Sequence, residues 1–441
     1  MINFFGTDGI RGPVGTDFFV REKLHVIGKA IGEWSQHRYG KNARILIIHD
    51  TRISCAIIKA SLKTGLLLYP ITLYDAGILP TPAALHLLKQ NKQFDCAISI
   101  SASHNPAHDN GIKLLTGNGK LSPHDEQMLS ELITNHQNSS DSYNTLGQDI
   151  SIADSQEQYC SIITSYFSAS LLANKKIVID AAHGATYLVA EQIFNALGAT
   201  TIIINNKPDG TNINERCGTQ APTMLQQTVM QNCALAGFAF DGDGDRIIAV
   251  NRHGMLKDGD DILALLLEHP AYAHLNTIVG TQMTNQGFET HLTTRNKQLV
   301  RTAVGDKFVV EKLEQLNLLL GGEQSGHIIL KDIINTGDGI LVALRTLESM
   351  LHSGNWDMHT FTKYPQLLIN IPVQTKKDLT QSPLSDIITA AQNKLTTGRL
   401  LVRFSGTEPL LRIMIEAVTL EHAHTIGHDI TQQLETHLKI S

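Results

Sequence analysis

The sequence lacks the features that mark several classes of protein. No apolar run approaches the roughly 20 residues that a membrane-spanning helix needs. No long basic run provides an electrostatic footprint for DNA or RNA. The first residues, Met1–Phe5, lack the basic start and the apolar stretch of a secretory signal. We therefore expect a cytoplasmic protein that has neither a nucleic acid nor a membrane as its partner.

Motifs for disulfide chemistry and zinc are also missing. The five cysteines are an odd number, are widely spaced and form no C-x-x-C motif, so we expect reduced thiols. The 20 histidines include no H-E-x-x-H motif. His424 and His428 stand four residues apart on an expected terminal helix, and we interpret them as solvent-facing.

The length of the chain indicates several domains. Its 441 residues exceed one ordinary core, because domains usually hold about 100–200 residues. Hydrophobic residues make up 42% of the chain and charged residues 18%, which is typical of a folded soluble protein. The net charge of −6 still allows a small anionic substrate, since a few arginines in a cleft suffice to bind one.

Apolar runs of strand length alternate with helical patterns along the chain. In the first part, Ala43–Asp50, Ile71–Tyr74 and Phe94–Ile100 are predicted strands with helices between them. The pattern restarts with the predicted strands Lys176–Asp180 and Thr200–Ile204, and a third round begins near Asp258. This alternation predicts three α/β domains followed by a smaller C-terminal α+β domain.

Polar segments suggest where these domains divide. His136–Ser155 is rich in Asn, Ser, Asp and Gln, and we interpret it as the linker that closes the first domain. We place the four domains at residues 1–150, 156–250, 251–358 and 364–441. In each of the first three, a predicted strand ends in a polar loop, where ligands of open α/β sheets bind.

Three aspartates alternate with glycines directly after one apolar strand. The glycines allow the backbone to bend until Asp241, Asp243 and Asp245 converge on one cation. Such hard oxygen ligands favour Mg²⁺, Ca²⁺ or Mn²⁺ over zinc. An EF-hand would need glycine at its sixth position and glutamate at its twelfth, where Arg246 and Arg252 stand. A metal loop is therefore favoured, with an acidic turn as the alternative.

A second loop carries a potential nucleophile. The segment Ser101–Pro106 follows an apolar strand and contains two serines beside His104, with Lys113 shortly after. We expect an exposed serine here, whose hydroxyl is a weak nucleophile until a base or an electrophile activates it. The alternative is an ordinary turn, because serine is a common turn residue.

Two further loops carry groups suited to a sugar phosphate. One contains Arg403, Ser405, Gly406 and Thr407. Its guanidinium, hydroxyls and bare glycine amide are groups that bind a phosphate monoester. The other, Glu323–His327, offers hydrogen-bonding groups for sugar hydroxyls. Either loop alone fits an ordinary turn, but their occurrence together with the metal loop and the serine loop favours chemistry on a sugar phosphate.

In this order, the motifs resemble those of the α-D-phosphohexomutase superfamily, and within it the phosphoglucosamine mutases. The matching segments are Phe5–Gly12, Ser101–Lys113, Asp241–Arg246, Gly322–His327 and Arg403–Pro409. The narrower resemblance rests on the P-D-G, N-I-N and C-G motifs within Pro208–Gly218. It also rests on Gln324, where relatives acting on mannose or glucose phosphates commonly have methionine.

The resemblance implies both a fold and a reaction. It implies mixed sheets around a central cleft, and it suggests a homodimer. The implied reaction interconverts glucosamine 6-phosphate and glucosamine 1-phosphate through a phosphoserine and glucosamine 1,6-bisphosphate, with one Mg²⁺ per chain. This reaction supplies UDP-N-acetylglucosamine and cell-wall synthesis. The alternatives are a phosphomannomutase or phosphoglucomutase and a metal-dependent sugar phosphatase.

The resemblance also assigns roles to individual residues. It selects Ser103, directly before the histidine, as the phosphorylated serine in preference to Ser101. The implied catalytic residues are Ser103, His104, Lys113 and His327, with more weight on Lys113 as the proton-transfer group. The implied metal ligands are the phosphorylated Ser103 and Asp241, Asp243 and Asp245. The implied substrate contacts are Arg11, Arg246, Glu323, Ser325, Arg403, Ser405, Gly406 and Thr407.

Overall fold

The computed structural model describes residues 4–6, 8–90, 92–137, 139, 141, 146–405 and 409–438. The chain divides into two compact units, which we describe separately. The first comprises Met1–Met283 and Val300–His359, and the second comprises Thr284–Leu299 and Thr360–Ser441. Among the described residues, no helix has both the length and the apolar character that crossing a membrane requires.

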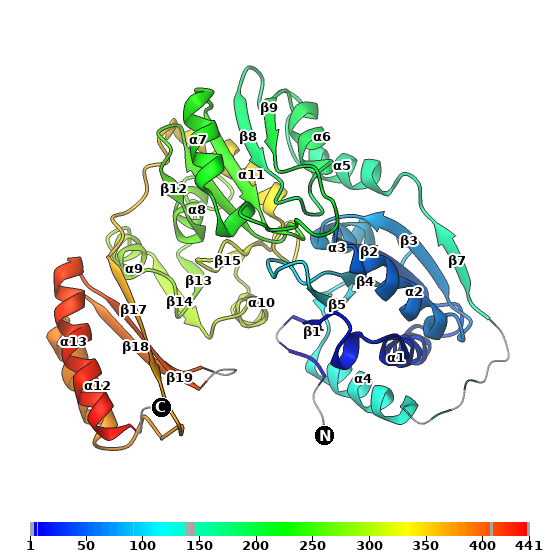
Figure 1. Cartoon of the computed structure of the whole chain (residues 1–441). Coiled ribbons are helices and arrows are strands. Elements are labelled where there is room, and N and C mark those ends of the chain that lie inside the picture. The colour runs from blue at the N-terminus through cyan, green and yellow to red at the C-terminus, as the bar shows by residue number, and fades with distance from the viewer. Residues whose placement is uncertain are drawn as a thin grey trace. The chain divides into compact units, whose positions relative to one another are not determined.

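The first domain is built on a mixed sheet of seven strands (Figure 1). Its strands are β1 (Ile10–Pro13), β2 (Arg44–His49), β3 (Thr72–Ile78), β4 (Cys96–Ile100), β5 (Asp109–Thr116), β6 (Gly119–Lys120) and β7 (Gln148–Ser151). The order is β1-β5-β4-β2-β3-β7, and β6 pairs with β5. Its helices are η1 (Asp17–Phe19), α1 (Arg21–Tyr39), α2 (Ser54–Leu66), α3 (Thr81–Gln90) and α4 (Pro123–His136). Every residue of β4 is buried, as its continuous apolar sequence predicts.

The linker predicted at His136–Ser155 is wrong in part, because it contains strand β7. This strand pairs in parallel with β3 at the edge of the sheet. All four of its residues are exposed, so its sequence carries neither an apolar run nor an alternation that would reveal a strand. Its pairing depends on the neighbouring strand rather than on a buried face of its own.

The second domain has a five-stranded sheet in the order β12-β11-β10-β8-β9. Its strands are β8 (Lys176–Asp180), β9 (Thr200–Ile204), β10 (Ala236–Phe240), β11 (Ile247–Asn251) and β12 (Leu256–Lys257). Its helices are α5 (Ser155–Ser165), α6 (Val189–Ala196), η2 (Gly218–Gln220) and α7 (Thr223–Gln231). Both β8 and β9 have the bounds that their apolar runs predicted.

The third domain has a four-stranded sheet in the order β14-β13-β15-β16. Its strands are β13 (Thr277–Thr281), β14 (Gln298–Thr302), β15 (Leu320–Gly322) and β16 (Ile328–Leu330). Its helices are α8 (Gly259–Leu266), α9 (Gln286–Thr293), α10 (Asp306–Gln315) and α11 (Gly339–Ser353). Helix α9 belongs to the second compact unit, where the amide of Gln286 donates to the carboxylate of Glu416 at 3.1 Å.

The C-terminal domain is a three-stranded antiparallel sheet with two helices (Figure 1). Its elements are β17 (Gln366–Pro372), β18 (Arg399–Phe404), β19 (Leu410–Glu416), α12 (Leu384–Lys394) and α13 (Leu420–His437). One apolar cluster from this sheet and both helices forms its core. The fold class is thus confirmed as three similar α/β domains and a smaller C-terminal domain, while the predicted boundaries stay a prediction.

The three α/β domains share a strand pattern that sequence similarity does not reveal. The orders β3-β2-β4-β5, β9-β8-β10-β11 and β14-β13-β15-β16 are equivalent, and each ends on a strand antiparallel to its neighbour. The loop before that last strand is the serine loop in the first domain, the aspartate loop in the second and the Glu323–His327 loop in the third. Three of the loops singled out in the sequence therefore occupy one equivalent position.

Gly326 lets the third of these loops lie close to the second domain. Its φ of +95° favours glycine, and a Cβ there would lie 1.9 Å from the carbonyl oxygen of Ile247. The Ile247 amide donates to the Gly326 carbonyl at 3.1 Å. The contact therefore requires the absence of a side chain.

We expect Gly326→Ala to destabilise the protein by about 3 kcal/mol, because it combines an unfavourable φ with a backbone collision. Gly354→Ala is the matched control, since Gly354 also has positive φ (+72°) but has open space where a Cβ would stand. The control should lose only about 1–2 kcal/mol. Thermal unfolding of both variants measures the difference, and equal losses would contradict the prediction.

Candidate active site

The aspartate loop lies between β10 and β11, which pair as an antiparallel hairpin. Asp241, Asp243 and Asp245 are all buried, and one carboxylate oxygen from each lies within 4.8 Å of the others. Gly244 has a φ of +74°, which turns the backbone sharply between the last two. The convergence that the alternation predicted is therefore present.

The hydrogen bonds of these aspartates leave two oxygens for a cation. Asp241 accepts from the Ser103 hydroxyl and the Arg246 amide, and Asp243 accepts from the Thr81 hydroxyl. The Oδ1 atoms of Asp243 and Asp245 are buried and have no hydrogen-bond partner among the described residues. Buried carboxylate oxygens without partners are costly, and a hard divalent cation satisfies them. The cluster therefore fits a metal ion.

The like charges in this cluster also favour a cation. Burial, together with the charges of Asp245 and Asp243, raises the pKa of Asp241 well above its ordinary value. A bound cation reverses this effect, because it stabilises the ionised carboxylates.

Ser103 reaches directly into the aspartate cluster. Its Oγ donates to Asp241 Oδ2 at 2.6 Å. The side chain is 1% exposed, so the prediction of an exposed serine is wrong. The serine does follow a strand, as expected, but Gly242 of the second domain packs on its backbone. Ser103 is therefore buried by a segment that is distant in the sequence, and the local sequence around Ser103 does not reveal this burial.

The backbone of Ser103 adopts an unusual conformation that its neighbours stabilise. Its φ is +52°, a region that non-glycine residues rarely adopt. Its amide donates to Ser101 Oγ at 2.9 Å, and Ser101 donates in turn to the buried Asp50 at 2.6 Å. Arg52 donates to the Ser103 carbonyl at 3.0 Å and forms an ion pair with Asp50. Ser101 thus supports the loop, whereas Ser103 presents its hydroxyl.

Lys113 connects the first domain to the aspartate loop. Its ammonium lies 2.8 Å from Asp243, 2.8 Å from Asp8 and 3.5 Å from Asp245. Burial disfavours the charged amine, but these carboxylates outweigh it and raise the pKa of Lys113. Asp8 also pairs with Arg11 and with Lys120. Lys113 is therefore held as a cation, which favours an electrostatic role over that of a base.

His104 is the imidazole nearest to the serine hydroxyl. Its Nδ1 lies 3.3 Å from Ser103 Oγ. Burial, aided by the charges of Arg246 and Arg11, lowers the pKa of His104 to about 4. At neutral pH the ring is uncharged and able to accept a proton.

His327 stands on the other side of the cluster. Its Nδ1 lies 3.7 Å from Asp245, and its Nε2 accepts a bond of 3.0 Å from the Gly337 amide. Burial lowers its pKa, yet the carboxylates of Asp245 and Asp306 outweigh burial and raise the pKa of His327 to about 9. An imidazolium has no free nitrogen to accept the Gly337 bond. The Gly337 bond and the raised pKa therefore make opposite demands on the ring, and the direct bond favours the neutral form with its proton on Nδ1.

The predicted sugar loop forms the turn between β15 and β16. Glu323 is 6% exposed, accepts from the Gly305 amide at 3.0 Å and has its pKa raised by burial. Ser325 is exposed at the tip of the turn. Arg246 is partly buried, and its Nε has no partner among the described residues. These groups line the side of the cluster contributed by the second and third domains.

The predicted phosphate loop lies in the second compact unit, between β18 and β19. Arg403 stands opposite Arg412 in the strand register, so two cationic residues lie side by side. Ser405 is buried, and its amide donates to the Leu410 carbonyl at 2.8 Å. Gly406 and Thr407 lie outside the described residues.

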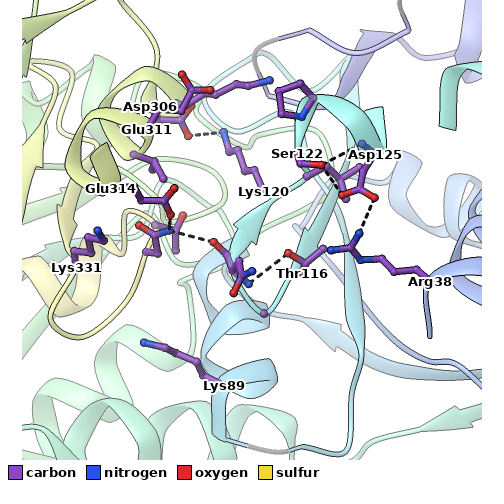
Figure 2. A pocket seen from close by; sticks show the side chains of 18 residues that line it. Arg38, Lys89, Thr116, Lys120, Ser122, Asp125, Asp306, Glu311, Glu314 and Lys331 are labelled. Carbon is purple, nitrogen blue, oxygen red and sulfur yellow. Dashed lines mark hydrogen bonds and ion pairs between the residues drawn. The ribbon is translucent and has the colours of Figure 1, made fainter. Parts of the chain in front are cut away.

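A cavity of about 490 Å³ lies between the first and third domains, and Lys120 is one of the residues that line it (Figure 2). Figure 2 shows Lys120 directed at Asp306 across this space, and an ion pair joins them. Lys120 therefore links Asp8 to the start of α10. Charges of both signs line the cavity, and Lys307 on its wall pairs with Glu126 at 3.0 Å.

Several residues that shape the site were given no role in the sequence analysis. They are Asp8, Asp50, Arg52, Thr81, Lys120, Asn214 and Arg412. Most of them act across domain or strand boundaries, where the distance along the chain is large. Asp8 and Asn214 do stand in segments that the resemblance had marked, Phe5–Gly12 and Pro208–Gly218, but neither residue was given a role there.

A buried serine beside a carboxylate cluster, on three similar α/β domains, defines an enzyme of the phosphoryl-transfer class. Models of the four phosphoglucomutase/phosphomannomutase domains match the chain in order. Domains I, II and III match residues 3–140, 157–254 and 258–364, and the C-terminal domain matches residues 368–433. The chain belongs to the phosphoglucomutase/phosphomannomutase family, and within it to the phosphoglucosamine mutases, as full-length relatives show.

Two such relatives are named phosphoglucosamine mutase. One, from Caldicellulosiruptor bescii, is 39% identical over 452 aligned residues, which cover 99% of this chain and all of the relative. Another, from Zymomonas mobilis, is 38% identical and covers 97% of this chain and 98% of its own length.

Solved structures share the fold at lower identity. A phosphoglucomutase/phosphomannomutase family protein from Burkholderia thailandensis matches with a TM-score of 0.80 and 22% identity, over 99% of this chain and 98% of that one. The N-acetylphosphoglucosamine mutase of Aspergillus fumigatus matches with a TM-score of 0.62 and 16% identity, over 99% and 96% of the two chains.

We expect Mg²⁺ to raise the Tm of the protein, because a cation relieves the repulsion among three buried carboxylates. Binding at about 100 times Kd adds about 2.7 kcal/mol of stability. Asp243→Asn should reduce this rise. Asp17→Asn, at an exposed aspartate outside the cluster, should preserve it. Differential scanning fluorimetry with and without EDTA measures the effect, and an unchanged rise in Asp243→Asn would argue against this metal site.

Proposed function

We propose that the protein interconverts glucosamine 6-phosphate and glucosamine 1-phosphate through a phosphoserine at Ser103 and a glucosamine 1,6-bisphosphate intermediate. The observation that carries the proposal is the 2.6 Å bond from Ser103 Oγ into the buried aspartate cluster. The amino sugar is inferred from full-length relatives named phosphoglucosamine mutase at 35–39% identity. Such an activity would supply UDP-N-acetylglucosamine and cell-wall synthesis.

In the proposed reaction, a hydroxyl of glucosamine 6-phosphate attacks the phosphorus on Ser103. The bond between phosphorus and Ser103 Oγ breaks, which yields the bisphosphate and the free serine. After the bisphosphate turns around, the Ser103 hydroxyl attacks the phosphorus of the phosphate on C6. The bond between that phosphorus and the C6 oxygen breaks, which leaves phosphoserine and releases glucosamine 1-phosphate. Asp241, Asp243, Asp245 and the phosphoserine would hold one Mg²⁺ per chain, which supplies positive charge against the oxygens of the transferring group.

The side chains around Ser103 divide the remaining tasks. His104, neutral and 3.3 Å from Ser103 Oγ, is suited to accept or return the proton of that hydroxyl. Lys113, which the resemblance favours for proton transfer, is held by three carboxylates and is better suited to orient the cluster. His327 is a third proton-transfer group, beside Asp245.

The substrate contacts are also part of the proposal. Arg11 and Arg246 would steady the phosphoserine, and Glu323 and Ser325 would bind the sugar hydroxyls. Arg403, Ser405, Gly406 and Thr407 would bind the phosphate that is not reacting. We further place the enzyme in the cytoplasm as a homodimer.

Ser103→Ala is expected to abolish mutase turnover, because no hydroxyl remains to carry the phosphate. The change removes one hydrogen bond to Asp241, so we expect a stability loss of only about 1–3 kcal/mol. A coupled assay for glucosamine 1-phosphate measures turnover, and mass spectrometry of the wild-type protein should find phosphate on Ser103. Phosphate found only on Ser101, or near-normal activity of the variant, would contradict the assignment.

The sugar preference is expected to appear in kcat/KM. The value for glucosamine phosphate should exceed the values for glucose and mannose phosphates, measured with the same preparation and bisphosphate activator. A higher value for glucose or mannose would favour the other mutases of the family. Steady release of inorganic phosphate without isomerisation would favour a phosphatase.

A further inference from the structure

The segment that follows β9 has no role in the proposed chemistry, although it carries the N-I-N motif. Both of its ends are fixed. The Gly210 carbonyl accepts from the Ile53 amide of the first domain at 2.9 Å. The Gly218 amide donates to the buried carboxylate of Asp180 in the second domain at 3.0 Å.

Between these anchors, Asn214 reaches the serine loop. Its Nδ2 donates to the carbonyl of Ser103 at 2.9 Å and to that of Asn105 at 3.2 Å. Its own amide donates to the Ala182 carbonyl at 2.9 Å, which fixes the residue to the second domain. Its φ is +60°, a conformation that asparagine tolerates better than most residues. The segment therefore delivers one amide group to the backbone of the proposed nucleophile.

Arg52 of the first domain shares the same two acceptors. Its guanidinium donates to the Ser103 carbonyl at 3.0 Å and to the Asn105 carbonyl at 2.8 Å. Each carbonyl oxygen has two lone pairs, so both can accept from both side chains. Arg52 ties the loop to its own domain, whereas Asn214 ties it to the domain that carries the aspartates.

Close packing at Gly242 reinforces this connection. A Cβ at Gly242 would lie 2.5 Å from the Ser103 carbonyl oxygen and 2.8 Å from Asn214 Nδ2. The neighbour of Gly242 is Asp241, which accepts from Ser103 Oγ. Asn214 and Asp241 thus hold the two ends of one residue, its carbonyl and its hydroxyl.

We propose that Asn214 is a positioning residue that fixes the backbone of Ser103 relative to the aspartate loop during phosphoryl transfer. The proposal rests on the function proposed above. A bond to the main chain persists whether the serine hydroxyl is free or phosphorylated. It therefore holds the phosphorylated and the free form of Ser103 in the same position. This matters because small displacements of the reacting groups lower the reaction rate strongly.

Asn214→Gly tests this role because glycine adopts the positive φ readily and removes the side chain that carries the amide group. We expect the single-turnover rate of phosphate transfer from phosphorylated enzyme to glucosamine 6-phosphate to fall by about 10- to 100-fold. KM should stay within about threefold, since Asn214 contacts the loop rather than the substrate. Asn214→Asp should be at least as impaired, because its carboxylate would face two carbonyl oxygens.

Asn174→Gly is the matched control, since Asn174 also has a φ of +60° but is exposed and remote from the serine loop. It should transfer phosphate at the wild-type rate. All preparations are first phosphorylated with glucose 1,6-bisphosphate, and the phosphate on Ser103 is quantified by intact-mass spectrometry. The rise in Tm with Mg²⁺ should be the same in Asn214→Gly as in wild type, which separates positioning from loss of the aspartate loop.

A transfer rate for Asn214→Gly within about twofold of wild type would overturn the inference and leave the proposed function intact. So would a slow rate that is matched by a lost Mg²⁺ response, because the defect would then be structural. If wild type transfers phosphate to glucose or mannose phosphates but not to glucosamine 6-phosphate, the proposed sugar fails. The Asn214 comparison is then made on the accepted sugar, with the same criteria.

Discussion

The structure depends on burying three carboxylates in one place. Asp241, Asp243 and Asp245 repel one another, and burial removes the water that would screen them. Lys113 offsets part of this cost from the first domain, and the Ser103 hydroxyl donates to one of the three. The remaining negative charge is what makes the cluster suitable for a cation. Folding of the first three domains is thus coupled to electrostatics at their meeting point.

The shared strand pattern helps to explain why three equivalent loops come together at this cluster. Each loop precedes the antiparallel last strand of the shared pattern, so the repeated architecture places the three loops alike. Two glycines, which have no side chain to keep the backbones apart, then allow these loops to pack closely. Gly242 packs on the Ser103 carbonyl, and Gly326 packs on Ile247. Glycine is needed at both points because a single Cβ would separate a loop from its neighbour.

The sequence predicted what local pattern controls. Continuous apolar runs predicted β8 and β9 with their bounds, and the alternation of aspartate with glycine predicted the carboxylate cluster. Strand β7 was missed because all four of its residues are exposed. The burial of Ser103 was missed because it arises from Gly242 of the second domain. The roles of Arg52 and Asn214 were missed because these residues contact Ser103 from 51 and 111 residues away along the chain. No local pattern encodes such contacts.

The proposed reaction uses Ser103 both as phosphate donor and as phosphate acceptor, so the contacts that hold this residue in place must suit both of its forms. A bond to the hydroxyl, such as the one to Asp241, must be lost once the oxygen carries phosphate. Bonds to the amide and the carbonyl are independent of that change. Ser101, Arg52 and Asn214 all bind the main chain of Ser103, and together they maintain its positive φ. In the proposed reaction, support through the backbone would therefore allow one residue to serve both half-reactions without rebuilding the loop between them.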